Sequence, residues 1–476
     1  MEKMKIFIIY IIFQSFISSQ NSDIVFVFEH VRHGARSPLF YDGNTNYDDH
    51  FGTIWEGASV LTEVGKRTHY AIGIHNRLKY SSLINFSKFD YKEIELYSTN
   101  SGRVLQSVQA ELLAMYLPGT LRNLSEDELK AALPPFKNIS SEVSDEIKLL
   151  NSSTIIDDIN VFPIKFSAPE KTRLHEPESC PYMANYTVQL KNEIQDEINL
   201  FLKDFDEQFG EDLQQYLNKP NRDFAFDFDF VQIILADEYI SNYYNGNNFS
   251  DFKNKTKIDT EKFLKYCQES KNFYIFHLNL DEKTGVMSAS PQMRDIINYM
   301  ENIINNKTNT PKMVIHGGHD NTINYFQYFM HNVFNFSLSF IPFASSVYFE
   351  LHKNGTTKDD YYVEYIYNGE SLMKMKFNEF KDKVMKAVWS DEQIKNFCYP
   401  KEGGTTGTDN DDDNKTLIII LISTSSVFFV LSLIYFILFI LYYKKSKNYI
   451  PLGKKDALLT SKGSENNELE PTYSNY

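Results

Sequence analysis

The chemistry open to this chain is most evident in one short segment near its N-terminus, residues 31–38 (VRHGARSP). The segment places His33 between Arg32 and Arg36. The planar guanidinium of arginine matches two phosphate oxygens at once, and a neutral imidazole can attack phosphorus. The flanking guanidiniums disfavour a further positive charge, so they keep the imidazole neutral. Taken alone, the segment fits a phosphate site and a solvated basic turn equally well, and the rest of the chain must decide.

Two later segments supply the groups that the first one lacks. Arg103 lies in the first turn of a helix expected over residues 103–116, where free backbone N–H groups favour an anion. His319 and Asp320 end another segment, residues 316–320 (HGGHD). Hydrolysis of a phosphate monoester needs positive charge around the phosphate oxygens, an in-line nucleophile and an acid for the leaving oxygen. The three segments together offer all of these groups.

Expected β-strands lead into all three segments. Apolar or β-branched runs at residues 24–28, 95–98 and 312–315 predict strands, and the helical spacing of apolar residues predicts helices over 61–80 and 103–116. Parallel strands end at the same edge of a sheet, and open α/β sheets bind their ligands at that edge. The sequence therefore predicts an α/β fold with an open, mainly parallel sheet flanked by helices.

The middle of the chain differs in composition and pattern from the segments of the expected sheet. Segments rich in Lys, Glu and Asp have helical patterns, such as residues 186–202, and alternate with loops rich in Asn and Ser. Further along, residues 346–351 and 361–365 alternate like antiparallel strands joined by a turn at Asn354 and Gly355. The expected order is a first part of the α/β core (20–117), a mainly helical inserted domain (118–285) and a second part of the core (286–400).

Both ends of the chain predict passage into and through a membrane. Residues 1–19 have the basic start and apolar run of a signal peptide, and residues 416–443 form an uncharged stretch long enough to span a bilayer. Lysines follow the stretch and aspartates precede it, so the tail, 444–476, is expected in the cytoplasm. Residues 401–415 form a polar stalk, and Tyr449 to Leu452 fits a tyrosine-based sorting signal that an adaptor would bind. The sequence thus predicts a single-pass type I membrane protein of the lysosome, the endosome or the cell surface.

The charge of the chain limits its partners. The formal net charge is −15, and the basic tail and signal make the expected ectodomain more acidic still. An acidic domain argues against nucleic acid as a partner, so an anionic substrate must be drawn by local Arg and His side chains. A phosphate monoester substrate satisfies this condition. A homodimer is also compatible with the sequence.

Three cysteines, Cys180, Cys267 and Cys398, lie in a part of the chain that should be oxidised. They allow at most one disulfide within the chain and leave one thiol over. N-x-S/T sequons, such as those at Asn85 and Asn335, are typical of a glycosylated surface.

The motifs resemble those of the histidine acid phosphatases, which belong to the histidine phosphatase superfamily and have an α/β core with a smaller helical domain. The resemblance begins at residues 32–38 (RHGARSP) and ends with the distant His319 and Asp320. It also includes the patterns at residues 61–73, the group Ser98, Thr99, Arg103 and Ser107, and the pair Ala344 and Ser345. The signal peptide, the single span and the short tail are most similar to the membrane-anchored lysosomal type.

The resemblance implies a role for each matching residue. His33 would be the nucleophile that forms a phosphohistidine, and Asp320 would give the proton to the leaving group. The substrate phosphate would be bound by Arg32, Arg36, Arg103 and His319. The resemblance implies neither a metal ion nor another cofactor, and it assigns the chain to the phosphoric monoester hydrolases.

The resemblance also implies one disulfide, between Cys180 and Cys398, which leaves Cys267 free. Members of the family usually carry more disulfides, and Ser346 stands where one of their cysteines is expected, so that bridge should be absent. Thr68 stands where the family usually has glutamine, at a position without a chemical role.

The sequence allows three other interpretations. The H-x-x-H spacing of His30 with His33, and of His316 with His319, could indicate a metal site, but such pairs fall on opposite faces of a strand and their arginine neighbours repel a cation. A phytase-like or lipid-phosphate phosphatase would share the chemistry and differ in the helical insertion. A catalytically silent adhesion or receptor domain would have no need of both His33 and Asp320.

Overall fold

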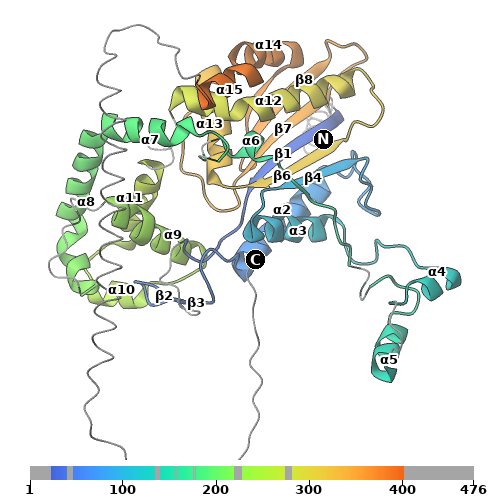
Figure 1. Ribbon diagram of the computed structural model, residues 1–476, viewed down its shortest axis with the longest axis horizontal. Coiled ribbons are helices and arrows are strands. Elements are labelled where there is room, and N and C mark those ends of the chain that lie inside the picture. Colours follow the sequence, from blue (N-terminus) through green and yellow to red (C-terminus); the bar gives the residue numbers. More distant parts are fainter. Residues whose placement is uncertain are drawn as a thin grey trace, which may run out of the picture. The chain divides into compact units, whose positions relative to one another are not determined.

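A seven-stranded sheet carries the site residues (Figure 1). The computed structural model describes residues 23–39, 47–134, 140–155, 157, 159–174, 176, 178–218, 224, 228–273 and 281–400. In spatial order the strands are β5 (Lys165–Phe166), β4 (Ile94–Ser98), β6 (Met313–Gly318), β1 (Asp23–Arg32), β7 (Ser346–Lys353), β8 (Tyr361–Tyr367) and β9 (Glu370–Lys376). The first four run parallel to one another, and each of the last three is antiparallel to the strand before it in this order.

The register of the central strands brings three strand ends together. Arg32, the last residue of β1, pairs with Gly318 of β6, and Ser98, the last residue of β4, pairs with Gly317. The three segments that follow these strands therefore start at the same edge of the sheet, as the sequence predicts for a ligand site in an α/β fold.

Helices cover both faces of the sheet because the side chains of β1 alternate in direction. Val27 packs with Val108 and Leu112 on the face covered by α2 (Glu63–Lys79) and α3 (Gly102–Met115). Phe26 and Phe28 point to the opposite face. That face is covered by α12 (Glu282–Ile304), α13 (Asp320–Phe334), α14 (Phe377–Ala387) and α15 (Asp391–Cys398). All of these β1 side chains are almost completely buried.

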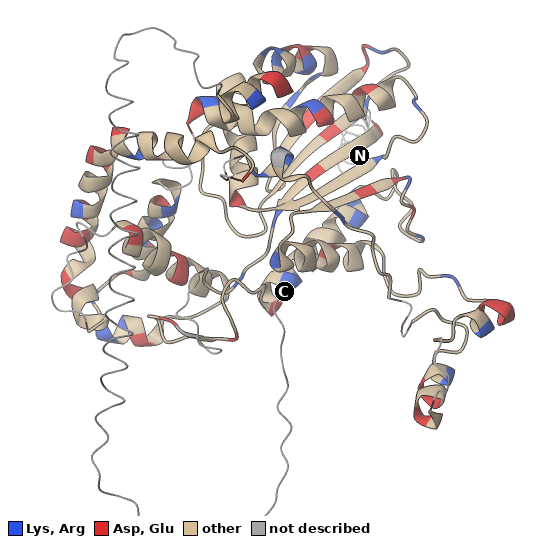
Figure 2. Cartoon of the chain, in the orientation of Figure 1, with Lys and Arg blue, Asp and Glu red and all other residues tan. Residues whose placement is uncertain are grey.

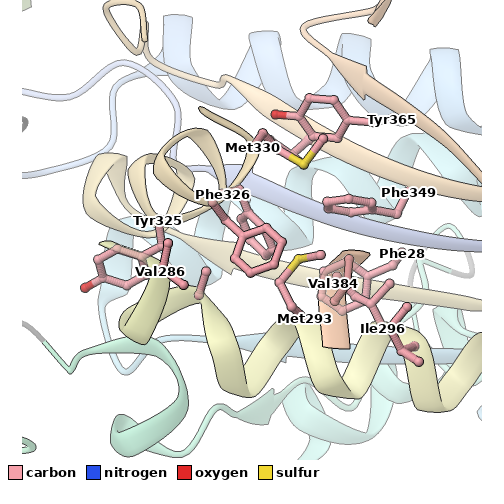
Figure 3. Close-up of a cluster of buried hydrophobic side chains, with 14 of the residues drawn as sticks. Phe28, Val286, Met293, Ile296, Tyr325, Phe326, Met330, Phe349, Tyr365 and Val384 are labelled. Atoms are coloured by element: carbon pink, nitrogen blue, oxygen red, sulfur yellow. The ribbon is translucent and has the colours of Figure 1, made fainter. Parts of the chain in front are cut away.

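Aromatic and sulfur-containing side chains fill the core on the α12 and α13 side. Figure 3 shows Phe28 of β1 close to Met293 of α12 and Phe326 of α13. The rings of Phe28 and Phe326 meet edge to face, with their centroids 6.4 Å apart. This packing fixes α13, the helix whose first residue is Asp320, against the strand that ends at Arg32.

A second group of helices has a hydrophobic core of its own. Its members are α8 (Gln195–Tyr216), the π-helix η4 (Phe230–Leu235), α9 (Ala236–Tyr244), α10 (Ser250–Lys255) and α11 (Thr260–Asn272). The preceding helix α7 (Tyr182–Glu193) instead packs through Met183 with the core on the α12 and α13 side. Phe205, Tyr239 and Phe263 lie in the core of the second group, which also takes in Ala35 and Phe343 from beside the sheet. Acidic side chains are spread along α8 (Figure 2). The shared core places α9 next to the loop that follows β1.

The smaller elements of the described chain complete this arrangement. They are the hairpin β2 (Tyr47–Asp48) and β3 (Ile54–Trp55), and the helices α4 (Glu126–Ala131), α5 (Ser141–Leu149) and α6 (Pro169–Thr172). The hairpin is tied to α9, because the carboxylate of Asp49 accepts hydrogen bonds from Trp55 and Asn242.

The structure confirms the predicted fold class, a mostly parallel sheet with flanking helices, and differs in detail. The helical pattern over residues 186–202 is interrupted at Ile194, which ends α7 and precedes α8. A loop of residues 354–360 joins β7 to β8 where a tight turn was expected. The edge strands β5 and β9 were not predicted, because an edge strand buries few side chains and so has a weak alternating pattern.

Several predicted segments lie outside the described residues. These are the signal peptide (1–19), the stalk (401–415), the membrane span (416–443), the tail (444–476) and the sorting motif at Tyr449 to Leu452. Among the helices of the described chain, none is long and apolar enough to cross a bilayer.

Candidate active site

His33 is the first residue after β1, and its ring is fixed by the backbone. Its Nδ1 lies 2.9 Å from the carbonyl oxygen of Gly34, so Nδ1 carries the proton and donates it. The other ring nitrogen, Nε2, is then the one with a free lone pair. Burial lowers the pKa of His33 well below its usual value, and Arg32 and Arg103 lower it further. The ring is therefore a neutral imidazole, the form that can attack phosphorus.

Gly34 and Ser107 allow the loop around His33 to lie close to α2 and α3. A Cβ atom on Gly34 would lie 2.5 Å from the carbonyl oxygen of Gly65, so only a glycine allows this approach. The Gly34 N–H donates to Ser107 Oγ at 3.0 Å, and Ser107 in turn donates to the carbonyl of Arg103. The Ala344 N–H donates to the carbonyl of His33. These contacts fix the nucleophile candidate from both sides.

Arg32 extends from the end of β1 towards α13. Its Nη2 lies 2.8 Å from Asp320 Oδ2, and its Nη1 donates to the carbonyl of Ile341. The guanidinium also stacks over Phe343, 4.4 Å from the ring centroid. Since Arg32 is 5 % exposed, these contacts determine where its positive charge lies.

Arg36 is clamped by a carboxylate from the second group of helices. Both oxygens of Asp237, on α9, accept hydrogen bonds from Arg36, at 2.9 and 3.0 Å. Asp237 also accepts from the Leu39 N–H and forms an ion pair with Lys271 at 3.3 Å. Burial alone would raise the pKa of Asp237, but Arg36 and Lys271 outweigh it and hold the pKa below its usual value. The two-point contact fixes the plane of the Arg36 guanidinium.

Arg103 and His319 form a chain of hydrogen bonds across the site. Arg103 Nη1 donates to Ser59 Oγ at 2.7 Å, and its Nη2 lies 3.3 Å from His319 Nδ1. His319 Nε2 lies 3.0 Å from Thr99 Oγ1. Burial lowers the pKa of His319 to about 3, and the charge of Arg103 adds to this effect. His319 is therefore neutral, with Nδ1 as acceptor and Nε2 as donor.

Asp320 begins α13, directly after β6, and faces Arg32. Its side chain is 28 % exposed, whereas that of Arg32 is 6 % exposed. Burial raises the pKa of Asp320, but Arg32 and His319 outweigh burial and bring it to about 2. Asp320 is thus ionised in the empty site.

These side chains line one cavity of about 240 Å³. Five of the lining residues are basic and three are acidic, so the cavity is positive within an acidic protein. The basic ones are Arg32, Arg36, Arg103, Arg173 and Lys271, and the acidic ones are Glu176, Asp237 and Asp320. A phosphate group is small enough to enter and would meet His33 and at least three guanidiniums.

The cavity contains every site residue that the sequence predicted. His33, Asp320, Arg32, Arg36, Arg103 and His319 all line it. Sequence reasoning missed Asp237 and Lys271, which lie far from the motifs in the chain. The run from Ala236 to Asn242 is buried throughout, charged residues included, and nothing in its composition marks that burial.

The predicted disulfide is confirmed. Cys180 and Cys398 are joined, with an S–S distance of 2.03 Å and a Cα–Cα distance of 4.6 Å. Cys267 is free and buried on α11, and burial raises the pKa of its thiol. The bond ties the start of α7 to the end of α15, away from the cavity.

The two histidine pairs of the sequence are divided between core and cavity. His30 and His316 stack in the core, 5.9 Å between centroids, and His33 and His319 meet edge to face in the cavity, at 5.5 Å. Within the described residues, one group has side chains close enough to hold a metal ion: Glu350, His352 and Glu364. It lies on β7 and β8, where Lys79 and Lys374 already pair with the carboxylates.

Comparison with known proteins agrees with this geometry. The family model of the histidine phosphatase superfamily (branch 2) matches residues 23–368. The chain belongs to the histidine phosphatase superfamily. This confirms the resemblance recognised in the sequence motifs, and it agrees with the expected enzyme class, a phosphoric monoester hydrolase.

Two acid phosphatases are relatives of this chain. Lysosomal acid phosphatase of Xenopus laevis is 31 % identical over 112 residues, which cover 23 % of this chain and 25 % of that protein. Prostatic acid phosphatase of Bos taurus is 23 % identical over 343 residues, which cover 71 % of this chain and 76 % of that protein. The alignment to the first thus spans only about a quarter of its length.

Solved structures share the fold. The phytase of Citrobacter braakii has a TM-score of 0.51 and 13 % identity, covering 77 % of this chain and 98 % of its own. The phytase of Hafnia alvei has a TM-score of 0.50 and 10 % identity, covering 77 % and 97 %. At these identities the likeness concerns the fold alone.

Proposed function

We propose that this protein is an acid phosphatase that hydrolyses phosphate monoesters through a phosphohistidine on His33. One observation carries the proposal. The neutral His33 ring has its Nδ1 bound to the Gly34 carbonyl, which leaves Nε2 as the nucleophile in a cavity lined by Arg32, Arg36 and Arg103.

The first chemical step transfers the phosphoryl group to the protein. His33 Nε2 forms a bond to phosphorus as the bond from phosphorus to the ester oxygen breaks. The departing oxygen keeps that electron pair and takes a proton from Asp320, which is ionised in the empty site and receives this proton from the substrate monoanion. Arg32, Arg36 and Arg103 stabilise the charge on the three equatorial oxygens. His319 donates to the phosphate once its contact with Thr99 is exchanged.

The second step regenerates the free protein. Water attacks the phosphorus of the phosphohistidine, and Asp320, now a carboxylate, takes the proton of that water. The bond from phosphorus to Nε2 breaks and the electron pair returns to His33. Inorganic phosphate leaves with the proton that Asp320 took from the water, so Asp320 is again ionised. Asp320 thus acts as an acid in the first step and as a base in the second.

The test is to trap the phosphohistidine on the full-length chain. The reaction with a ³²P-labelled aryl phosphate is quenched during turnover at pH 5. We expect acid-labile label on the wild type and none on His33→Ala. Turnover by His33→Ala should fall by at least about 10³-fold, since the covalent route is lost. The variant should still unfold at the wild-type temperature. Persistent labelling of His33→Ala would refute the nucleophile, and a folded wild type that binds phosphate without turnover would favour a silent receptor domain.

The charge of the cavity favours substrates with a single phosphate over the phytase-like alternative. Arg32 is paired with Asp320, Arg36 and Lys271 with Asp237, and Arg173 with Glu176. A highly phosphorylated inositol would bring several negative charges to these carboxylates. We therefore expect kcat/KM for phenyl phosphate to exceed that for inositol hexakisphosphate, and the reverse order would favour a phytase. A lipid phosphate presented in mixed micelles tests the remaining alternative.

We also propose that the chain is a type I membrane protein of the endosomal and lysosomal system. The sequence supports this through the signal peptide (1–19), the span (416–443) and the motif at Tyr449 to Leu452. Replacing Tyr449 by Ala should raise the abundance of the protein at the cell surface, because the adaptor site is lost. Unchanged surface abundance would remove the sorting role. A homodimer stays a prediction, which sedimentation of the purified protein can test.

A further inference from the structure

Ser59 has a backbone conformation that is unfavourable for its residue type and lies next to the site. Its φ is 62°, in the left-handed region that favours glycine. Such conformations persist in a non-glycine residue when the surrounding structure imposes them, and they gather at binding sites. The question is what the serine side chain does that a glycine at this position could not.

The side chain of Ser59 binds a residue of the proposed phosphate site. Its Oγ accepts a hydrogen bond from Arg103 Nη1 at 2.7 Å. The second bond of the Arg103 guanidinium goes from Nη2 to His319 Nδ1. An arginine has five N–H donors. The buried Nε–H of Arg103 has no partner within the described residues, so donors remain for a phosphate.

The turn that carries Ser59 is attached to the first sequence motif. The Ser59 N–H donates to the carbonyl of Pro38 at 2.7 Å, and Ser37 Oγ donates to the carbonyl of Gly57 at 2.6 Å. The Val60 N–H donates back to Ser37 Oγ at 2.8 Å. Ser37 and Pro38, at the end of the motif, therefore hold the turn in place, and the turn presents the hydroxyl of Ser59 to Arg103.

Arg103 differs from the other basic groups of the cavity in its partners. Arg32, Arg36, Arg173 and Lys271 each have a carboxylate within ion-pair distance. In the described part of the chain, Arg103 instead contacts a hydroxyl and a neutral imidazole. A neutral acceptor can fix the direction of a guanidinium without neutralising its charge. A carboxylate in the place of Ser59 would compete with the phosphate for the same cation.

We propose that Ser59 is a positioning residue, whose hydroxyl holds Arg103 in the orientation that binds the substrate phosphate while leaving its charge free. This inference rests on the proposed function. The strained backbone is retained because glycine, which would relieve the strain, has no hydroxyl to offer. The proposal thus predicts that backbone strain and phosphate affinity can be separated by substitution at this single position.

Four forms of the full-length protein test the separation. Ser59→Gly and Ser59→Ala both remove the hydroxyl, and only the glycine relieves the strain. Ser59→Thr keeps the hydroxyl and adds a β-branch, which suits a positive φ poorly. Calorimetric titration with inorganic phosphate at pH 5 gives the affinity, and thermal unfolding gives the Tm. The matched control is Asn309→Gly, which likewise introduces a glycine at a residue with a positive φ, here 66°, but at an exposed position.

The expected ranking of affinity follows the hydroxyl, and that of Tm follows the backbone. Wild type and Ser59→Thr should bind phosphate alike, and Ser59→Gly and Ser59→Ala should both bind about tenfold more weakly, with KM for an aryl phosphate raised to the same extent. The Tm of Ser59→Gly should exceed that of Ser59→Ala by roughly 2 °C. Asn309→Gly should bind phosphate like the wild type.

Any other ranking of affinity overturns the inference. If Ser59→Gly keeps the wild-type affinity, the hydroxyl does not position Arg103. If affinity follows Tm through the series, Ser59 serves only the fold of its turn. A wild type that neither binds phosphate nor hydrolyses aryl phosphates would refute the proposed function itself, which is a different result from a change confined to the variants.

Discussion

The guanidinium of Arg32 and the carboxylate of Asp320 lie 2.8 Å apart at the ends of two adjacent parallel strands. This pair holds the pKa of Asp320 at about 2, although burial alone would raise it. The group proposed to donate a proton is therefore ionised when the site is empty. A phosphate monoester has a second pKa near 6, so below that pH it enters as a monoanion that carries a proton of its own. Once its oxygens engage Arg32, that proton can pass to Asp320.

The first prediction concerns the dependence of activity on pH. We expect kcat/KM to be level between about pH 3 and 6 and to fall about tenfold for each unit above pH 6, as the substrate loses its proton. Because the pKa of Asp320 is lowered in the folded protein, the ion pair with Arg32 stabilises the fold above pH 4 and is lost as the pH falls towards 2. Initial rates with an aryl phosphate from pH 3 to 8 check the profile. An optimum above pH 7 would contradict it.

Asp320→Asn should separate good leaving groups from poor ones. A 4-nitrophenolate leaves with little protonation, whereas an alkoxide needs a full proton, so an alkyl phosphate should be slowed by about 10²-fold or more and 4-nitrophenyl phosphate much less. Steady-state kcat values for the two substrates, on wild type and variant, provide the measurement. Equal slowing of both would assign Asp320 to binding and not to proton transfer.

A third prediction concerns the clamp between Arg36 and Asp237. Both side chains are nearly fully buried, so Asp237→Asn leaves the charge of Arg36 without its partner, and we expect a loss of about 3 kcal/mol in the free energy of unfolding. KM should rise as the guanidinium loses its fixed plane. Denaturant unfolding and steady-state kinetics measure the two effects.

An exposed ion pair of the same geometry is the control for this clamp. Arg122 donates to both oxygens of Glu128, at 2.6 and 2.9 Å, but the pair is open to solvent. Glu128→Gln should leave both stability and KM almost unchanged, because exposed ion pairs contribute little. A loss of stability as large as that of Asp237→Asn would show that burial is not what makes the clamp strong.

A fourth prediction concerns the close approach of the His33 loop to α2. Gly34→Ala would bring a Cβ atom to 2.5 Å from the carbonyl of Gly65, so the loop must move and His33 with it. We expect a fall in kcat of at least about tenfold, since small displacements of reacting groups are costly, together with a lower Tm. Gly102→Ala is the matched control, because a Cβ there meets nothing within 4 Å. The idea fails if both alanine variants retain wild-type kcat.

Sequence reasoning succeeded where function depends on local order in the chain. His33 follows Arg32 and precedes Arg36 by three residues, and His319 and Asp320 follow the strand β6. Their motifs and the adjacent strand patterns could therefore be recognised in the sequence alone. It failed for Asp237, because the contact with Arg36 joins residues 201 positions apart. Ser59 escaped notice for a related reason. Its importance depends on a backbone angle and on the direction of one hydroxyl, and neither is encoded in a local pattern.

The last prediction concerns two histidines that the proposed reaction does not use. His30 and His316 stack in the core on neighbouring strands, where Phe28 and Tyr97 pack against His316 and Phe326 packs against His30. Burial and, to a smaller extent, the charge of Lys171 together lower the pKa of His316 to about 3. Burial also lowers the pKa of His30, with smaller contributions from His316 and His319.

These lowered pKa values reduce the free energy of unfolding in acid. Between pH 6.5 and about 3 the unfolded chain binds a proton at His316 that the folded protein does not, so the free energy of unfolding falls as the pH falls, by up to about 1.4 kcal/mol per unit for this one residue. His316→Phe removes the side chain that binds this proton in the unfolded chain. Its stability should therefore decline less steeply than that of the wild type between pH 6 and 4, whatever its stability at pH 7.5. Urea unfolding at several pH values gives the slopes, with Tyr97→Phe as a control that alters the same stack without removing a histidine. Parallel slopes for wild type and His316→Phe would show that this histidine does not limit the stability of the protein in acid.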